Sequence, residues 1–226
     1  MYNCIYSLGS HCVTATILKK YELRKFSGFF DYLFIHKSDN LLDVLNDSFS
    51  HILNLENHVP IQENHPLRAR LNDVSIYSKY DNEDVVTFTH HNLLKIETYE
   101  HYLRAKDRFL KMKNFNTLFI HTSYHPFDRL DEIKREFFVG TLKSKYNFSF
   151  FHILFIEIEE NSSQKKHSKL ITKTNDYTVY SINIHADSYT GAVFKNEFDN
   201  ENYINIIYDN FKLDLFDKIT IDNSSL

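Results

Sequence analysis

Two uninterrupted apolar segments constrain the fold of this chain more than any other feature. They are Thr117–Thr122 (TLFIHT) and Phe150–Ile158 (FFHILFIEI), and a helical pattern over Asp128–Lys143 lies between them. Strands that are apolar along their whole length are typical of a sheet covered on both faces. Two such strands joined by one helix are expected to be parallel neighbours with a right-handed crossover. The helix is expected to bury four apolar side chains: Leu130, Ile133, Phe137 and Leu142.

The rest of the sequence favours the same class. The chain opens with a strand over Tyr2–Ser7, a turn, and a helix over His11–Tyr21. Helices are also predicted over Ser38–Phe49, Leu93–Met112 and Glu201–Phe211, strands over Val74–Tyr77, Val85–Thr89 and Tyr177–Ile184, and a loop over His51–Asn72. No internal repeat or linker interrupts the 226 residues. We therefore expect a single α/β domain, residues 1–226, with a mixed, mostly parallel sheet and helices on both faces.

Charge and cysteine content exclude several classes of protein. Lys and Arg total 26 while Asp and Glu total 30, a formal net charge of -4, and a nucleic-acid-binding surface usually needs a basic excess. No apolar run reaches the ~20 residues of a membrane span, and the N-terminus lacks the pattern of a signal peptide. Two cysteines, Cys4 and Cys12, are too few for a disulfide-stapled secreted protein. We expect unbridged thiols in the cytoplasm of a bacterium or of a virus-infected cell, with no nucleic-acid partner and no membrane span.

The turn after the first predicted strand carries the leading candidate site. Ser10 is a suitable N-cap, which places Cys12 in the first turn of the following helix. The positive end of a helix stabilises a thiolate, lowers its pKa and makes it a nucleophile. Gly9 would let the backbone approach a substrate, and free N–H groups could form an oxyanion hole. The expected binding residues are Ser7, Gly9, Ser10 and His91. The alternative is that Cys12 only packs the helix against the sheet, a frequent role of cysteine.

Histidines and one carboxylate are candidates for the remaining catalytic roles. His90 and His91 follow a predicted strand, where a general base would be displayed, although a chain with 13 histidines has adjacent pairs by chance. Asp31 lies in an aromatic run (FFDYL), and a carboxylate buried there needs a partner. It could orient a histidine, cap a helix or face water.

A second group of polar residues lies at the end of the strand at Thr117–Thr122. His121 and His125 fall where ligands bind in open α/β sheets. No helical H-x-x-x-H pattern and no C-x-x-C pair supports a metal site. The chain also lacks a P-loop and a G-x-G-x-x-G motif. We therefore expect no metal and no cofactor.

The first 34 residues resemble a known family. The run SLGSHCVTATILKKYELRKFSGFFDYLF resembles the opening of the DUF1796 family, described as papain-like cysteine peptidases, which reads SLG-x-x-C-x-x-A-x-x-L and later PFDW. The residues that fit are Ser7, Leu8, Gly9, Cys12, Ala15, Leu18 and Asp31. The FTHH motif, Phe88–His91, resembles the family's F-x-H-[DH] element, and Arg108-Phe109 fit the end of its basic helix. The chain departs from PFDW, because Phe29 and Tyr32 replace the Pro and the Trp.

The resemblance implies a thiol enzyme. Cys12 would attack, His90 or His91 would accept its proton, and Asp31 would orient the imidazole, in a cysteine-dependent hydrolase or a related acyl transferase. The substrate, whether a peptide, an acyl compound or a glycan, is not specified. A papain-like α+β fold is the alternative to the α/β fold. The alternative functions are a glycan-linked transferase and a non-catalytic domain that binds a ligand near His121 and His125.

Overall fold

The computed structural model describes residues 1–9, 11–35, 37–68, 71, 73–81, 87–124, 129–160, 168–184, 194 and 196–215. Its strands are β1 (Cys4–Ser7), β2 (His58–Pro60), β3 (Ser75–Tyr77), β4 (Thr117–Tyr124), β5 (Phe151–Glu160), β6 (Ser168–Lys173) and β7 (Tyr177–Ile184). Its α-helices are α1 (Cys12–Lys20), α2 (Ser38–Asn46), α3 (Ile96–Lys111), α4 (Glu132–Ser144) and α5 (Glu197–Asn210). Short 3₁₀ turns cover Leu55–Asn57 and Met112–Asn114. None of the helices in these ranges is long and apolar enough to cross a membrane.

The main sheet is mixed and mostly parallel. Its strand order is β1-β4-β5-β7-β6, and β1, β4, β5 and β7 are parallel while β6 is antiparallel to β7. The predicted parallel pairing of the two apolar strands is confirmed, because Thr117 is opposite Phe151 and Tyr124 is opposite Ile158, with α4 between the strands in the chain. This topology confirms the α/β class and favours it over an α+β arrangement.

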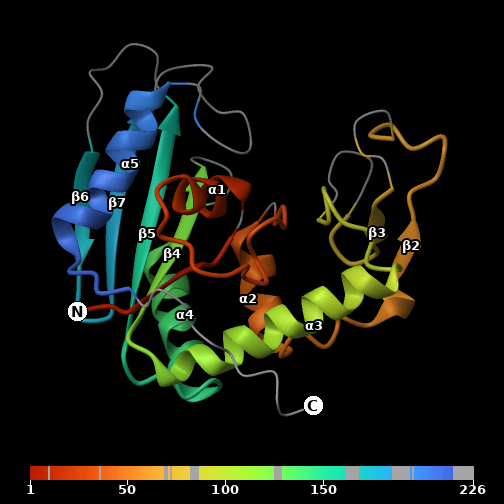
Figure 1. Cartoon of the computed structure of the whole chain (residues 1–226), viewed down its shortest axis with the longest axis horizontal. Coiled ribbons are helices and arrows are strands. Elements are labelled where there is room, and N and C mark those ends of the chain that lie inside the picture. The colour runs from red at the N-terminus through yellow and green to blue at the C-terminus, as the bar shows by residue number, and fades with distance from the viewer. Residues whose placement is uncertain are drawn as a thin grey trace.

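Helices cover both faces of the sheet, as expected (Figure 1). The face that carries Tyr6, Phe119 and Phe155 packs against α2, α3 and α4, for example through Phe109 and Phe138. The opposite face packs against α1 and α5; its buried side chains include Ile5, Ile120, Ile156, Val13, Ile17 and Ile207. The four parallel strands, β1, β4, β5 and β7, therefore alternate between two apolar layers, which explains why their sequences are apolar on both sides.

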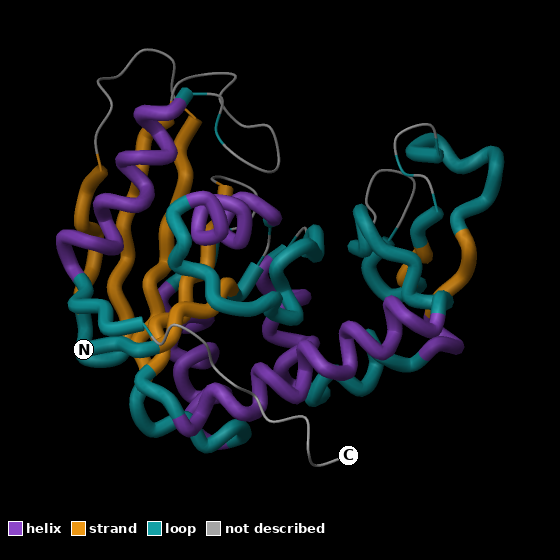
Figure 2. The backbone as a smooth tube through the Cα atoms, viewed as in Figure 1, coloured by secondary structure: helices purple, strands orange, loops and turns teal. Residues whose placement is uncertain are grey.

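Helix α3 carries a smaller unit away from the sheet. Figure 2 shows the short β2–β3 pair beside the N-terminal end of this long helix. The pair is antiparallel, and the ring of His58 stacks on Tyr77 at 5.2 Å between centroids. The strand predicted over Val85–Thr89 is not present at residues 87–89, and residues 82–86 lie outside the described ranges. The loop between this unit and α3 carries His90.

Helix α4 turns a different side to the sheet than its apolar spacing predicts. Leu130 and Leu142 are buried as expected, whereas Ile133 is 81% and Phe137 is 53% exposed. The side chain of Arg135 is buried in their place and pairs with Glu157 on β5. A buried ion pair therefore fixes the rotation of this helix.

Candidate functional site

The turn between β1 and α1 requires glycine. Gly9 has φ +66, and a Cβ atom at this position would lie 3.0 Å from both the Cβ and the carbonyl oxygen of Phe30. A left-handed backbone of this kind is strained for other residues. The Gly9 N–H donates to the Ser7 hydroxyl at 3.3 Å, which tightens the turn. The turn places Cys12 at the first residue of α1, beside the carboxyl end of β1.

The start of α1 differs by one residue from the prediction. The N-cap residue is His11, whose side chain makes no capping hydrogen bond. Ser10, the expected cap and binding residue, lies outside the described residues. The His11 ring instead packs edge-on against Phe34 and Tyr124, with centroids 5.0 and 4.7 Å apart.

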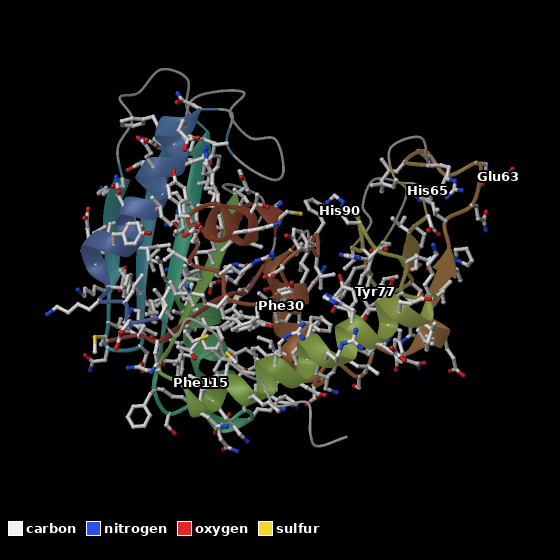
Figure 3. The ribbon with its side chains drawn as sticks, viewed as in Figure 1. Phe30, Glu63, His65, Tyr77, His90 and Phe115 are labelled. Carbon is white, nitrogen blue, oxygen red and sulfur yellow. The ribbon has the colours of Figure 1, made fainter. Side chains whose placement is uncertain are left out.

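The fold brings Cys12 and His90 together. The Cys12 Sγ lies 3.9 Å from the His90 Nε2, so the two candidate residues are in contact. Cys12 is half-buried and His90 is exposed. Figure 3 shows His90 between α1 and the β2–β3 unit, on the loop that leads to α3. A proton acceptor next to a thiol is the arrangement that activates a cysteine nucleophile.

Burial controls the acidity of the thiol. Desolvation raises the pKa of Cys12 above its ordinary value, and the negative charge of Asp31 adds to the rise. A hydrogen bond from the backbone N–H of Cys12 lowers the pKa, but by less than desolvation raises it. The expectation that the helix start lowers this pKa is therefore wrong, because desolvation exceeds the stabilisation by the helix end. The resting thiol is neutral.

Asp31 is paired with arginine. Its buried carboxylate accepts hydrogen bonds from the Arg24 Nη1 at 2.7 Å and from the Gly28 N–H at 2.8 Å. Burial raises the pKa of Asp31 to about 6, although the Gly28 bond and the Arg24 charge favour the ionised form. Of the groups that the structure describes, Arg24 and Gly28 hold this carboxylate, rather than the imidazole of His90 that sequence reasoning assigned to it.

Tyr32 links this ion pair to the histidines. The Arg24 Nη1 donates to the Tyr32 hydroxyl at 3.1 Å, and the guanidinium lies 5.4 Å from the centre of its ring. The same ring meets His90 edge-on and lies against His91, each at 6.3 Å between centroids. Sequence reasoning did not assign Tyr32 to the site. Tyr32 occupies the position of the Trp in the PFDW motif of the DUF1796 family, and this correspondence is the sequence feature that could have identified it.

The His91 side chain has different neighbours from the His90 side chain. Its ring stacks on His101 at 6.3 Å and meets Tyr102 edge-on at 5.5 Å, so it packs against α3. Burial lowers the pKa of His91, and the neighbouring His101 and His90 lower it further. The structure therefore places His90, and not His91, beside the thiol.

His121 lies in the interior below the turn. Its ring is buried against Phe138 and Phe155, with centroids 6.3 and 5.8 Å away. Burial lowers the pKa of His121 to about 4, while hydrogen bonds to the backbone of Gly9 and Leu8 oppose the shift. A neutral, buried ring of this kind supports the turn and is not placed to take a proton from substrate. His125, the other histidine predicted at this edge, falls outside the described ranges.

Metal ligands do not gather in the described part of the chain. Within it, no group of three or more His, Cys, Asp or Glu residues is arranged to hold a metal ion. The two cysteines are free thiols, as predicted. Cys4 is buried with its Sγ 3.2 Å from the Met112 sulfur, and burial raises its pKa to about 12. Cys4 is therefore an inert internal reference for the reactivity of Cys12.

Comparison with known proteins identifies one family. The model of the DUF1796 family, whose description is "putative papain-like cysteine peptidase", matches residues 3–175. No curated protein and no solved structure matches the chain significantly. The matched range holds Cys12, Asp31 and His90, and it covers more than half of the 226 residues. The chain therefore belongs to the DUF1796 family.

Proposed function

We propose that this protein is a cysteine-dependent hydrolase or acyl transferase, with Cys12 as the nucleophile and His90 as the general base. The observation that supports the proposal is the 3.9 Å separation of the Cys12 Sγ and the His90 Nε2. This separation exceeds an ordinary hydrogen bond, and catalytic contacts often tighten when substrate binds. The family description, a papain-like cysteine peptidase, supports the same class of reaction.

The raised pKa of the thiol determines how the pair would work. Because the resting Cys12 is neutral, its proton moves to the His90 Nε2 as the sulfur bonds to the acyl carbon of the substrate. His90 then gives that proton to the leaving group as the bond to it breaks, and a thioester remains. Water, or a second acceptor in acyl transfer, loses a proton to His90 and attacks the thioester. His90 finally returns the proton to the departing sulfur.

The start of α1 would stabilise the negative charge that develops on the substrate oxygen. The first N–H groups of a helix have no partner within the helix. In α1 the N-cap side chain does not bind them. They lie at the same end of the helix as Cys12, so an acyl oxygen on the attacked carbon would face these donors. The binding roles of Ser7 and Gly9 in this proposal are to shape the turn that aligns them.

A non-catalytic binding domain is the second candidate. Two observations favour it: the pKa of Cys12 is raised and not lowered, and Asp31 is held by Arg24. In that case Cys12 would pack against His90 at a ligand-binding turn. The acyl-transfer reaction distinguishes the two candidates, because only a nucleophile forms a covalent intermediate.

The test is acylation by p-nitrophenyl acetate. We expect a burst of p-nitrophenol and one acetyl group on Cys12, which hydroxylamine removes and mass spectrometry locates, while the buried Cys4 stays unmodified. Cys12→Ala should abolish the burst. His90→Ala should slow acylation by about 10²–10⁴-fold, the usual contribution of a general base, and His91→Ala, the matched control, should slow it far less. Acylation of Cys12 that does not depend on His90 would refute the proposed mechanism.

A further inference from the structure

A row of buried polar side chains crosses the sheet near the carboxyl ends of its parallel strands. Ser123 on β4, Glu157 on β5 and Ser181 on β7 are opposite one another in register, and they are only 3%, 2% and 7% exposed. Two residues earlier on β5 and β7 the same face is apolar, with Phe155 opposite Val179 in the core. The apolar layer under α4 therefore ends in a row of polar side chains. Packing of a sheet between two layers of helices does not require such a row, because burying polar groups is costly.

Two arginines meet the one carboxylate in this row. Glu157 pairs through Oε1 with the Arg135 Nη2 and through Oε2 with the Arg129 Nε, the second at 2.9 Å. One arginine would neutralise Glu157, and Arg129 brings a second cation beside it. The next carboxylate along β5, Glu159, accepts a hydrogen bond from the Ser181 hydroxyl at 3.0 Å. Only the Arg135 contact with Glu157 is a hydrogen bond, whereas the Arg129 contact is an ion pair, so most N–H groups of the two guanidiniums are not bound to Glu157.

One of those donors is buried without an acceptor. The Nε of Arg135 has no hydrogen-bond partner among the residues that the structure describes, and the residue is only 6% exposed. Its guanidinium lies 5.9 Å from the centre of the Phe155 ring, which holds the group in place. A buried donor left unpaired is costly, so native proteins almost always provide an acceptor. A ligand with oxygen atoms would supply it.

The row lies where a ligand is expected in this fold. Ligands of open α/β sheets bind at the carboxyl ends of the parallel strands. Strands β1, β4, β5 and β7 are parallel, so this edge also holds the Cys12 turn (Figure 1). The row begins on β4, the strand next to β1, and the His121 side chain of β4 contacts the backbone of Gly9 in the turn. The row is therefore a neighbour of the candidate active site and not part of it.

We propose that Arg129 and Arg135 form an oxyanion-binding site for a phosphate or carboxylate group of a small molecule. Glu157 fixes both guanidinium groups, and their free N–H donors, with the hydroxyl of Ser123 nearby, bind the oxygens of the anion. Planar guanidinium groups match the geometry of both anions. Anion binding at this site does not involve the Cys12 thiol, so a test of the site is independent of a test of the proposed function.

Thermal unfolding with added anions tests the site. The intact protein is titrated with sodium phosphate and, separately, with sodium acetate, and sodium chloride keeps the ionic strength constant. We expect a saturable rise of Tm, because a ligand that binds only the folded state stabilises it. A response to phosphate alone assigns the site to phosphoryl groups, and a response to both anions extends it to carboxylates.

Arg129→Gln removes the second cation and leaves the Glu157–Arg135 pair intact. We expect it to weaken the apparent affinity at least tenfold. Arg104→Gln is the matched control, because Arg104 is an exposed arginine that pairs with Glu100 on α3, away from this row. Arg129→Lys keeps the charge but not the planar fork, so it should weaken affinity several-fold even if the Gln variant does not fold.

Two results would overturn the proposal. One is a wild-type Tm that responds to phosphate and acetate no more than to sodium chloride. The other is an Arg129→Gln or Arg129→Lys protein that is folded by circular dichroism and binds the anion as tightly as the wild type.

Discussion

The Cys12 sulfur lies 3.9 Å from the Nε2 atom of His90, and 78 residues of sequence separate the two. Cys12 begins α1, while His90 belongs to the loop before α3, so the contact depends on the packing of separate parts of the chain. Tyr32 lies against the histidine ring, and Arg24 holds both Tyr32 and Asp31. Among the residues that the structure describes, an aromatic ring, and not a carboxylate, flanks the imidazole beside the thiol.

The first prediction concerns the pH dependence of thiol alkylation. Because burial raises the pKa of Cys12, little thiolate exists at neutral pH. The rate of modification by iodoacetamide should rise with pH and reach half its maximum above pH ~8.5, the pKa of an unperturbed cysteine. Mass spectrometry of the Cys12 peptide between pH 6 and 10.5 measures the rate. A midpoint near pH 6 would instead reveal a preformed thiolate–imidazolium pair and contradict the neutral resting thiol.

The apolar strands could be predicted from the sequence because both of their sides are buried. Tyr177–Ile184 was predicted with its observed bounds, and Thr117–Thr122 was short by two residues. Strand β6 was missed because it is exposed along most of its length, so its sequence, SKLITK, carries no burial pattern. Its pairing with β7 supplies the structure that its own residues do not indicate.

Partners of charged side chains were the least predictable feature. The sequence showed that Asp31 in an aromatic run needs a partner, but not that Arg24 would supply it. Helix α4 shows the same limit, because Ile133 keeps helical spacing yet is exposed while Arg135 is drawn inward by Glu157. Periodicity counts apolar residues and cannot register an ion pair with a strand that is distant in sequence. The roles of Cys12 and His90 remain predictions.

Gly9→Ala should destabilise the protein and displace the site. The substitution forces a Cβ atom to within 3.0 Å of the Phe30 backbone and side chain at φ +66. We expect a loss of about 1–3 kcal/mol in the free energy of unfolding, together with slower acylation of Cys12. Gly140→Ala is the matched control, because no atom lies within 4 Å of its new Cβ in α4. It should stabilise the protein by about 0.5–1 kcal/mol; equal effects of the two variants in urea unfolding would contradict the argument.

Asp31→Asn should destabilise the protein most at acidic pH, by about 1 kcal/mol, because burial disfavours the ionised carboxylate and the amide is an imperfect substitute for the neutral carboxyl between Arg24 and Gly28. The pH dependence has a definite sign. The pKa of Asp31 is about 6 when folded and about 3.9 when unfolded. The folded state therefore binds the extra proton, and the stability that this proton contributes is present below pH ~4 and lost as pH rises through 6.

The Asn variant lacks this titration. The difference in unfolding free energy between wild type and Asp31→Asn should therefore shrink as pH rises from 4 to 7. Urea unfolding at four pH values measures it. A difference that grows over this range would mean that the carboxyl pKa is lowered and that the ion pair, and not burial, dominates.

The last prediction assigns the positioning of His90 to the Tyr32 ring. Tyr32→Phe removes only the hydroxyl that binds Arg24 and keeps the ring 6.3 Å from His90, so acylation of Cys12 should change less than threefold. Tyr32→Ala removes the ring, and the exposed His90 side chain then samples orientations that do not meet the thiol. We expect acylation to slow about tenfold or more, since misplacement by about 1 Å can cost 10²-fold.

A double variant distinguishes a role of Tyr32 in positioning His90 from a merely structural role. If Tyr32 acts through His90, adding Tyr32→Ala to His90→Ala should cause no further loss, because the base that it positions is already absent. A merely structural role would instead slow the double variant again and lower its Tm in proportion. If Tyr32→Phe slows acylation as much as Tyr32→Ala does, the hydrogen bond from Arg24 to the Tyr32 hydroxyl positions His90. The proposal that the aromatic ring positions it would then be refuted.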